Sequence, residues 1–147
     1  MATVQTLNPQ IIGQTERALG ALMNKVLATA GGTFPQWVAL TITAGADDGI
    51  DQERLIERLA DALAVDASAA SAVVTELIES DLLRTLPGPD RRLGLSERGR
   101  NRHAQIRDAI GDVTGRLFGD AADEDLRTAG RVLTLITARA RAELAEA

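Results

Sequence analysis

The sequence contains no cysteine and few aromatic residues. Without thiols the chain forms no disulfide, no thiolate metal site and no sensor based on cysteine oxidation. Its aromatic content is 2%, from two phenylalanines and one tryptophan, with no tyrosine. Because single-stranded nucleic acids are recognised largely by stacking bases on aromatic side chains, this composition argues against extensive recognition of that kind.

Long apolar runs are also absent. No stretch approaches the ~18 apolar residues of a transmembrane helix, and the start, MATVQTLNPQ, lacks the pattern of a secretory signal. We therefore expect a cytoplasmic protein with no membrane partner. The 147 residues, 45% apolar and 25% charged, fit a single domain over 1–147. A chain of this length buries roughly 70% of its unfolded surface and needs no metal to fold.

Lysine is nearly absent, and charge is distributed unevenly. The net charge of −5, taken as a whole, argues against nucleic acid. However, residues 47–81 hold ten acids and two arginines, a net charge of −8, whereas 84–107 hold seven arginines and two acids, a net charge of +5. Screening makes such local differences matter more than the sum. The positive window is either a solvated helix start or a polyanion site, since arginine suits phosphate and guanine.

Apolar periodicity and capping residues predict six helices and one hairpin. Ile50 is expected to be a single buried strand-like residue, and short strands flank the turn Pro87-Gly88-Pro89-Asp90. The expected helices run from Asn8-Pro9 to Gly31-Gly32, from Thr33 to near Gly45, from Asp51 to about Ala64, from Asp66 to before Leu82-Leu83, from Ser96 to an end or bend at Gly115–Gly119, and from about Asp123 to the C-terminus.

The order of these elements defines a fold class. The two central helices, joined by Val65-Asp66, form a helix-turn-helix pair, and the hairpin after it is a wing. We expect a mainly α fold with a small β-hairpin (α+β), a winged helix-turn-helix between terminal helices. The terminal helices carry apolar stripes wider than one small domain covers, including a near-heptad seam at Ile106, Ile110, Val113 and Leu117. Either a second copy of the chain covers them, which we favour, or they close within one chain.

The second helix of the pair is the informative one. Its predicted inner face holds Ala70, Val73, Val74, Leu77 and Ile78, and its outer face is small and neutral at Ser68, Ser71, Ala72 and Thr75. Small polar side chains let a helix approach a surface closely, and hydroxyl groups bond base edges. The alternative is a merely alanine-rich helix. The attached wing favours contact with a DNA groove.

The sequence resembles the multiple-antibiotic-resistance regulator (MarR) family of winged-helix repressors. The resemblance rests on TFPQWVAL at 33–40, VDASAASAVVTELIESDLLR at 65–84, and PDRR followed by LSERGR within 89–100. It covers essentially the whole chain in element order. The resemblance implies an obligate homodimer, with a DNA-binding lobe at 33–96 and dimerisation helices at 1–32 and 97–147. It also implies a small aromatic effector bound between the two regions.

The resemblance assigns DNA contacts by position. It implies that Ser68, Ser71 and Thr75 contact bases or phosphates in the major groove, while Arg92, oriented by Asp90, enters a minor groove beside Arg91. Arg84 joins this set from the positive window. Three positions depart from the family pattern: Ala67 and Ala72 stand where arginine is common, and Asp81 stands where glycine is usual. The return strand is also short, so we expect a stubby wing and salt-sensitive binding.

Other chemistry is sparse. His103, the only histidine, is either a packing residue, which we favour, or a pocket ligand. Phe34, Trp37, Met23 and Phe118 either line an effector pocket with it or belong to the core, and we favour the core because buried aromatics usually do. No catalytic or nucleotide-binding motif appears. We therefore expect no enzyme, no metal and no cofactor.

The sequence thus predicts a homodimeric, sequence-specific DNA-binding regulator, a repressor on a pseudo-palindromic operator that a small-molecule effector releases. The alternative is a winged-helix protein-interaction module with weak or no DNA binding, motivated by the acidic window and the arginine-poor helix.

Overall fold

The structure, a computed structural model, describes residues 5–147. Residues 1–4 of the predicted dimerisation region 1–32 lie outside it. The chain divides into two compact units, the first ending at Ile110 and the second comprising Gly111–Ala147. The elements are α1 (Pro9–Thr29), α2 (Phe34–Ala44), α3 (Gln52–Leu63), α4 (Ala67–Glu79), β1 (Leu83–Thr85), β2 (Leu93–Leu95), α5 (Glu97–Phe118) and α6 (Asp123–Glu146), which confirms the predicted fold class.

Side chains cap α1, α2 and α4 at the residues where the sequence predicts these helices to begin. The Asn8 side chain accepts the Ile11 amide at 2.9 Å, and Asp66 Oδ1 accepts the Ala69 amide at 2.8 Å. Thr33 and Gln36 form a capping box, in which each side chain accepts the backbone amide of the other residue. Asp51 is a correction, because it precedes α3 but makes no side-chain capping bond. These bonds satisfy backbone N–H groups that have no partner within the helix.

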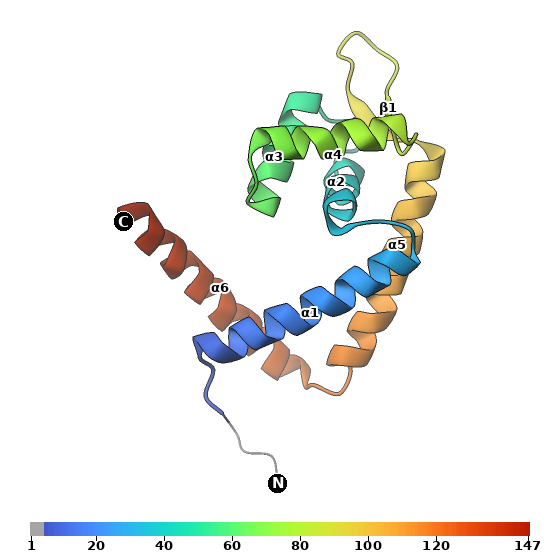
Figure 1. Ribbon diagram of the computed structural model, residues 1–147. Coiled ribbons are helices and arrows are strands. Elements are labelled where there is room, and N and C mark those ends of the chain that lie inside the picture. The colour runs from blue at the N-terminus through green and yellow to red at the C-terminus, as the bar shows by residue number, and fades with distance from the viewer. Residues whose placement is uncertain (1–4) are drawn as a thin grey trace. The chain divides into compact units, whose positions relative to one another are not determined.

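The core of the first unit lies among α2, α3, α4 and the hairpin (Figure 1). The fully buried side chains there, each no more than 1% exposed, include Leu40, Leu55, Leu59 and Leu77. Ile78 is a correction to the predicted inner face of α4, since it is 36% exposed. One helical residue rotates the side chain by about 100°, so Ile78 turns away from the core that Leu77 enters.

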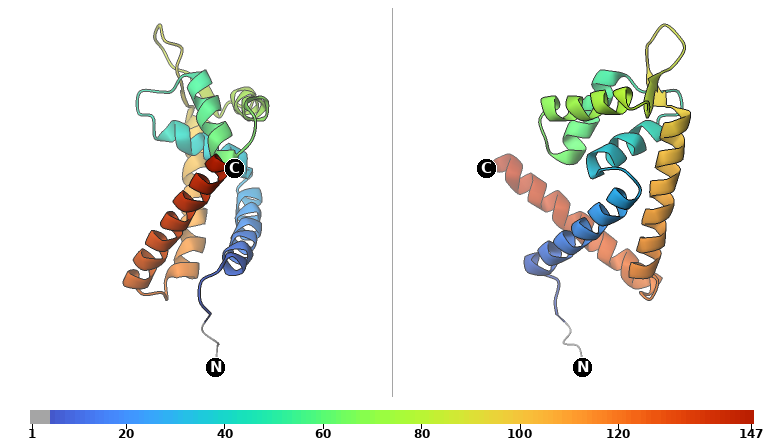
Figure 2. Two further views of the ribbon diagram at one scale, coloured as in Figure 1. Left: turned by 90° about the vertical axis from the view of Figure 1, so that its left-hand side faces the viewer. Right: turned by 45° about the vertical axis from the view of Figure 1, so that its right-hand side comes forward.

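The hairpin joins β1 and β2 antiparallel, with Leu83 opposite Leu95 and Thr85 opposite Leu93. Ile50 adds the predicted single strand-like residue, because its amide donates to the Leu93 carbonyl at 3.0 Å and its own carbonyl accepts in return at 2.8 Å. The loop at 86–92 projects beyond the helices around it, as both views of Figure 2 show. The wing is therefore anchored at its root and free at its tip.

The junction between α4 and α5 explains two features of the motif LSERG. Ser96 caps α5 as predicted, since its hydroxyl accepts the Gly99 amide at 2.9 Å while donating to the Asp81 carbonyl at 2.6 Å. Gly99 permits this approach, because a Cβ there would lie 2.0 Å from the Leu82 carbonyl oxygen. Asp81 has φ of 59°, a left-handed conformation that suits the glycine implied at that position.

The aromatic residues do not form the core that we favoured. Phe34 is 44% exposed and Phe118 is 42% exposed, and Trp37 is only half-buried. Phe34 is the first residue of α2, whose buried residues lie further along the helix at Ala39, Leu40 and Thr43. The core is instead aliphatic, and the aromatic side chains are left for contacts at the surface.

The second unit exposes most of its apolar residues in the single chain. No residue of α6 is buried. Several large apolar residues of the stripe predicted for α6 are exposed, namely Leu133, Leu135, Ile136 and Leu144. Leu117 and Phe118 at the end of α5 are exposed as well. These large apolar side chains are therefore left uncovered in the single chain. Within residues 5–147, no helix is long and apolar enough to cross a membrane.

Candidate nucleic-acid interface

The exposed face of α4 is small and uncharged. Ser68 and Thr75 are exposed and Ser71 is half-buried, and they repeat at intervals of three and four along one side of the helix. No lysine or arginine occurs between Asp66 and Ser80. The helix is therefore shaped for close approach to a surface but supplies no positive charge for holding a polyanion.

The wing supplies that charge. Arg91 and Arg92 are exposed on the loop that joins the strands, and the Leu86 amide donates to the Arg92 carbonyl at 2.7 Å to close it. Gly49 permits close packing at the wing root, since a Cβ there would lie 2.6 Å from Leu86 Cδ1 and 2.9 Å from Arg92 Cβ. The backbone of Arg91 has φ of 50°. The two guanidinium groups thus sit on a loop that is held at its base.

Asp90 does not orient Arg92 in this structure. Among residues 5–147 the single ion pair between side chains joins Arg107 Nε to Asp108 Oδ1 at 3.7 Å. Asp90 is exposed and makes no ion pair with the wing arginines. The orienting contact implied by the resemblance is absent from the free protein, and for a DNA complex it stays a prediction.

Arg84 lies on β1, away from the wing tip. Its side chain lines a cavity of about 560 Å³ between the hairpin, the end of α2 and the start of α5. Arg100 and Arg107 line the same cavity from α5, and Asp47 is the one acidic residue that does. Leu86 and Leu95 contribute an apolar wall. We name this the hairpin cavity; its charge and apolar wall suit an organic anion.

His103 joins the hairpin cavity to the aromatic residues. Its ring lines the cavity and stacks on Trp37, with centroids 4.9 Å apart and planes inclined by 18°. Thr41 Oγ1 lies 3.5 Å from Nε2. Burial lowers the pKa of His103 below its ordinary value of 6.5, and the positive charge of Arg107 lowers it further. The ring is therefore neutral near pH 7, able both to pack and to hydrogen-bond.

The other predicted pocket residues lie elsewhere. Neither Phe34 nor Met23 lines the hairpin cavity, and Met23 is half-buried on α1. Sequence reasoning missed Arg100 and Arg107 as cavity residues, although it counted both in the positive window. Their spacing with His103, at intervals of three and four on one helix, was the signal that could have found them.

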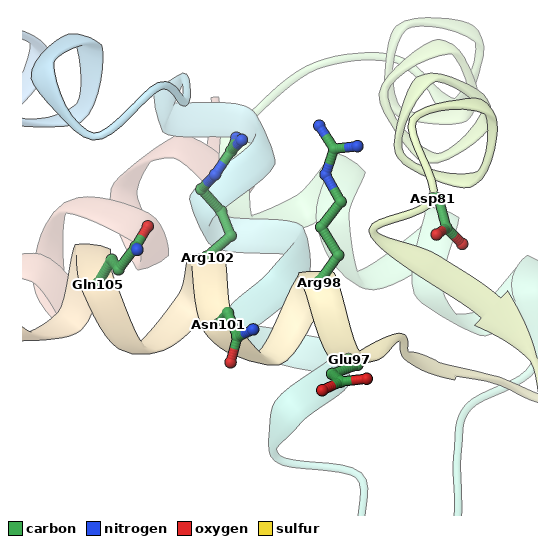
Figure 3. A pocket seen from close by; sticks show the side chains of 6 residues that line it. All are labelled: Asp81, Glu97, Arg98, Asn101, Arg102 and Gln105. Carbon is green, nitrogen blue, oxygen red and sulfur yellow. The ribbon is translucent and has the colours of Figure 1, made fainter.

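A second hollow lies on another side of α5 (Figure 3). It measures about 460 Å³ and is lined by Arg98, Asn101, Arg102 and Gln105 together with Asp81 and Glu97. In Figure 3, Arg98 and Arg102 rise from the helix on the same side. Arg102 Nη1 donates to the Gly31 carbonyl at 2.6 Å. Charges of both signs leave this hollow without a clear preference for a ligand. No cluster of three or more potential metal ligands occurs within residues 5–147.

Comparison with known proteins places this arrangement in a class. No model of a known protein family matches the chain, and no curated protein sequence does. Solved structures match at the level of fold. The Mycobacterium tuberculosis MarR family protein Rv2887, in a complex with DNA, is 17% identical, with a TM-score of 0.67 over 90% of this chain and 98% of that one.

Two Rhodococcus proteins are similar as well. A MarR family transcriptional regulator from Rhodococcus sp. RHA1 is 22% identical, with a TM-score of 0.66 over 90% of this chain and 97% of that one. CouR from Rhodococcus jostii RHA1, bound to p-coumaroyl-CoA, is 23% identical, with a TM-score of 0.69 over 86% and 88%. The chain is a winged helix-turn-helix protein with the fold of MarR family regulators, which confirms the fold that the resemblance implied.

Proposed function

We propose that the protein is a transcriptional regulator that binds double-stranded DNA sequence-specifically as a homodimer, acts as a repressor in the cytoplasm and carries no catalytic activity. One observation carries the proposal: the small neutral face of α4 stands beside a wing with unpaired arginines, in the fold of the DNA-bound Rv2887. Neutral hydroxyl groups suit base edges and guanidinium groups suit phosphates.

The proposed contacts divide by chemistry. Ser68, Ser71 and Thr75 would meet base edges or phosphates in the major groove, with α4 as the recognition helix. Arg91 and Arg92 would contact an adjacent minor groove or its phosphates, Asp90 would orient Arg92 once DNA is bound, and Arg84 would contact the backbone near the wing root. Because α4 lacks cations, most of the electrostatic attraction would come from the wing.

The exposed apolar residues of α6 and of the end of α5 support the proposed homodimer. In this proposal the lobe at 33–96 binds DNA, and the segments 1–32 and 97–147 dimerise. A two-fold dimer would contact a pseudo-palindromic operator whose half-sites lie about one helical turn apart.

The test is a selection of duplexes from a random pool, followed by fluorescence anisotropy at low salt. We expect a selected pseudo-palindrome to bind saturably with two protomers per duplex, and binding to weaken steeply as salt rises. Failure to enrich any duplex, with no saturable binding at low salt, would contradict the proposal. It would instead favour a winged-helix module that binds proteins, which the ten acids of residues 47–81 would suit.

We further propose that a small aromatic acid is the effector and that it binds in the hairpin cavity. Arg100 and Arg107 would hold its carboxylate, while Leu86 and Leu95 would contact its ring. The support is the excess of positive charge around an apolar wall. Similar folds have been solved with salicylic acid and with p-coumaroyl-CoA bound. Phe34 and Met23 would not take part, since they lie outside this cavity.

Trp37 provides a direct test of this site because it is the only tryptophan and stacks on His103. We expect salicylate to change Trp37 fluorescence saturably in the wild type, and Arg107→Ala to weaken that binding about tenfold. A matched control is Arg116→Ala on the same helix, which lies outside the cavity. If the two variants bound salicylate with equal affinity, the hairpin cavity would not be the binding site.

A further inference from the structure

The side-chain amide of Gln36 joins two elements that are forty residues apart in the sequence. Its Oε1 accepts the Thr33 amide at 3.2 Å, as half of the capping box at the start of α2. Its Nε2 donates to Glu76 Oε1 on α4 at 2.8 Å. One residue therefore closes the end of one helix and holds the flank of the helix that carries the candidate DNA contacts.

The junction that Gln36 caps is itself held by α5. Arg102 Nη1 donates to the Gly31 carbonyl at 2.6 Å. A Cβ added at Gly32 would lie 3.3 Å from Ile106 Cδ1 and 3.7 Å from Gln36 Oε1, so both side chains pack against this glycine. Ile106 is fully buried. A continuous set of contacts thus runs from α5 through the α1–α2 junction to Gln36 and on to Glu76.

Glu76 is well placed to set the orientation of α4. It directly follows Thr75, one of the candidate base contacts. Ala70, Val74 and Leu77 are buried on the inner side of α4. Apolar contacts are not directional, so they hold the helix against the core but restrain its rotation only weakly. A hydrogen bond is directional, so the bond from Gln36 restrains rotation of the helix about its axis. The bond between Ser96 and the Asp81 carbonyl restrains only the end of α4.

We propose that Gln36 is a positioning residue for α4, which links the α1–α2 junction and Arg102 of α5 to the orientation of the recognition surface through its bond to Glu76. The link is a property of the free protein. Its effect on DNA binding rests on the proposed function, so the experiment measures the two separately.

Two variants isolate the link from the helix cap. Gln36→Glu keeps the capping box, because a carboxylate oxygen also accepts the Thr33 amide, and an acid in the first turn suits the helix dipole. It removes the donor to Glu76 and sets two carboxylates against each other. In the double variant Gln36→Glu/Glu76→Gln the donor and acceptor are exchanged, so the bond can re-form with the net charge of the wild type.

The first readout is hydrogen exchange of the α4 amides in the free protein. We expect Gln36→Glu to speed exchange in α4 about tenfold while α3 is unchanged, and the double variant to return to within about twofold of the wild type. Unchanged α4 exchange in Gln36→Glu would overturn the proposal, and so would a double variant that fails to restore protection. If Gln36→Glu does not fold, Glu76→Ala, which leaves the cap intact, must show the same selective loss of protection in α4.

The second readout is affinity for a selected duplex. We expect Gln36→Glu to bind about tenfold more weakly and the double variant to recover, although neither side chain is among the candidate DNA contacts. If neither the wild type nor any variant binds DNA, the proposed function fails. The exchange result then still shows whether Gln36 holds α4. If the wild type binds DNA and exchange responds but affinity does not, Gln36 holds α4 without positioning it for DNA, and the proposal is overturned.

Discussion

Helix α4 and the wing differ in almost every physical respect. Helix α4 is held along one side by buried aliphatic residues, on its flank by Gln36 and at its end by Ser96. It carries no positive charge on its exposed face. The wing is fixed only at its root, and its loop carries Arg91 and Arg92 with no carboxylate paired to either.

This difference suggests a division of labour between the two elements. Counterion release from phosphates supplies a large share of the affinity of a DNA-binding protein, while contacts to base edges supply sequence preference. A neutral helix held by the core suits the second role, and an exposed cationic loop suits the first. The net charge of −5 therefore says little about DNA binding, because charge and shape reside in different elements.

The largest expected effect comes from breaking the attachment of α4 to α5. Gly99→Ala would place a Cβ 2.0 Å from the Leu82 carbonyl oxygen, and we expect the free energy of unfolding to fall by about 3 kcal/mol. Urea unfolding measures it. The matched control is Gly111→Ala on the same helix, where nothing lies within 4 Å and stability should rise by about 0.5–1 kcal/mol. Equal effects at both positions would mean that the end of α4 is not held as described.

The next effect tests the wing. Replacing both Arg91 and Arg92 with alanine should weaken binding to a selected duplex by about 10–100-fold. It should also lower the slope of log affinity against log salt by about 0.9 for each phosphate that the wing no longer neutralises. Because both side chains are exposed, stability should stay unchanged. An unaltered salt slope would show that the wing is not the source of electrostatic attraction.

A smaller effect of a different kind is expected at α4. Ser71→Ala should reduce discrimination at one base pair of each half-site by about 1 kcal/mol. The salt slope should be unaffected, since no charge is removed. Binding to a panel of single-substituted duplexes measures this. A uniform decrease in affinity over the whole panel, or none, would contradict a role in reading bases.

The smallest effect concerns His103. Because burial and Arg107 lower its pKa below 6.5, the unfolded chain binds a proton more readily than the folded one. Its contribution to stability is therefore complete above pH 6.5 and is lost as pH falls from there through the folded pKa. Urea unfolding at about pH 7.5 and about pH 5.5 should show a larger decrease in stability for the wild type than for His103→Gln. Equal decreases would mean that the ring is not desolvated.

The fold follows from local signals, and the site only in part. Caps at Asn8, Asp66 and Ser96 were predictable because short polar side chains bond the free amides at the start of a helix, and periodicity predicted the buried leucines. The exposure of Phe34 was not predictable, since it depends on which elements surround the start of α2. The hairpin cavity was not predictable for the same reason, because Arg84 and Arg107 line one cavity only after the hairpin has folded against α5.

The division between α4 and the wing can be tested most directly by cleaving DNA from each element. The chain lacks cysteine, so Ala72→Cys on α4 and Pro89→Cys at the wing tip each provide a single attachment point for a DNA-cleaving reagent, with Thr137→Cys on α6 as the control. We expect cuts within the major groove of each half-site from residue 72, cuts in the flanking minor groove from residue 89, and no cuts from residue 137. On a duplex that the protein binds, cuts from residue 137, or the absence of cuts from residue 72 or from residue 89, would contradict the division between α4 and the wing.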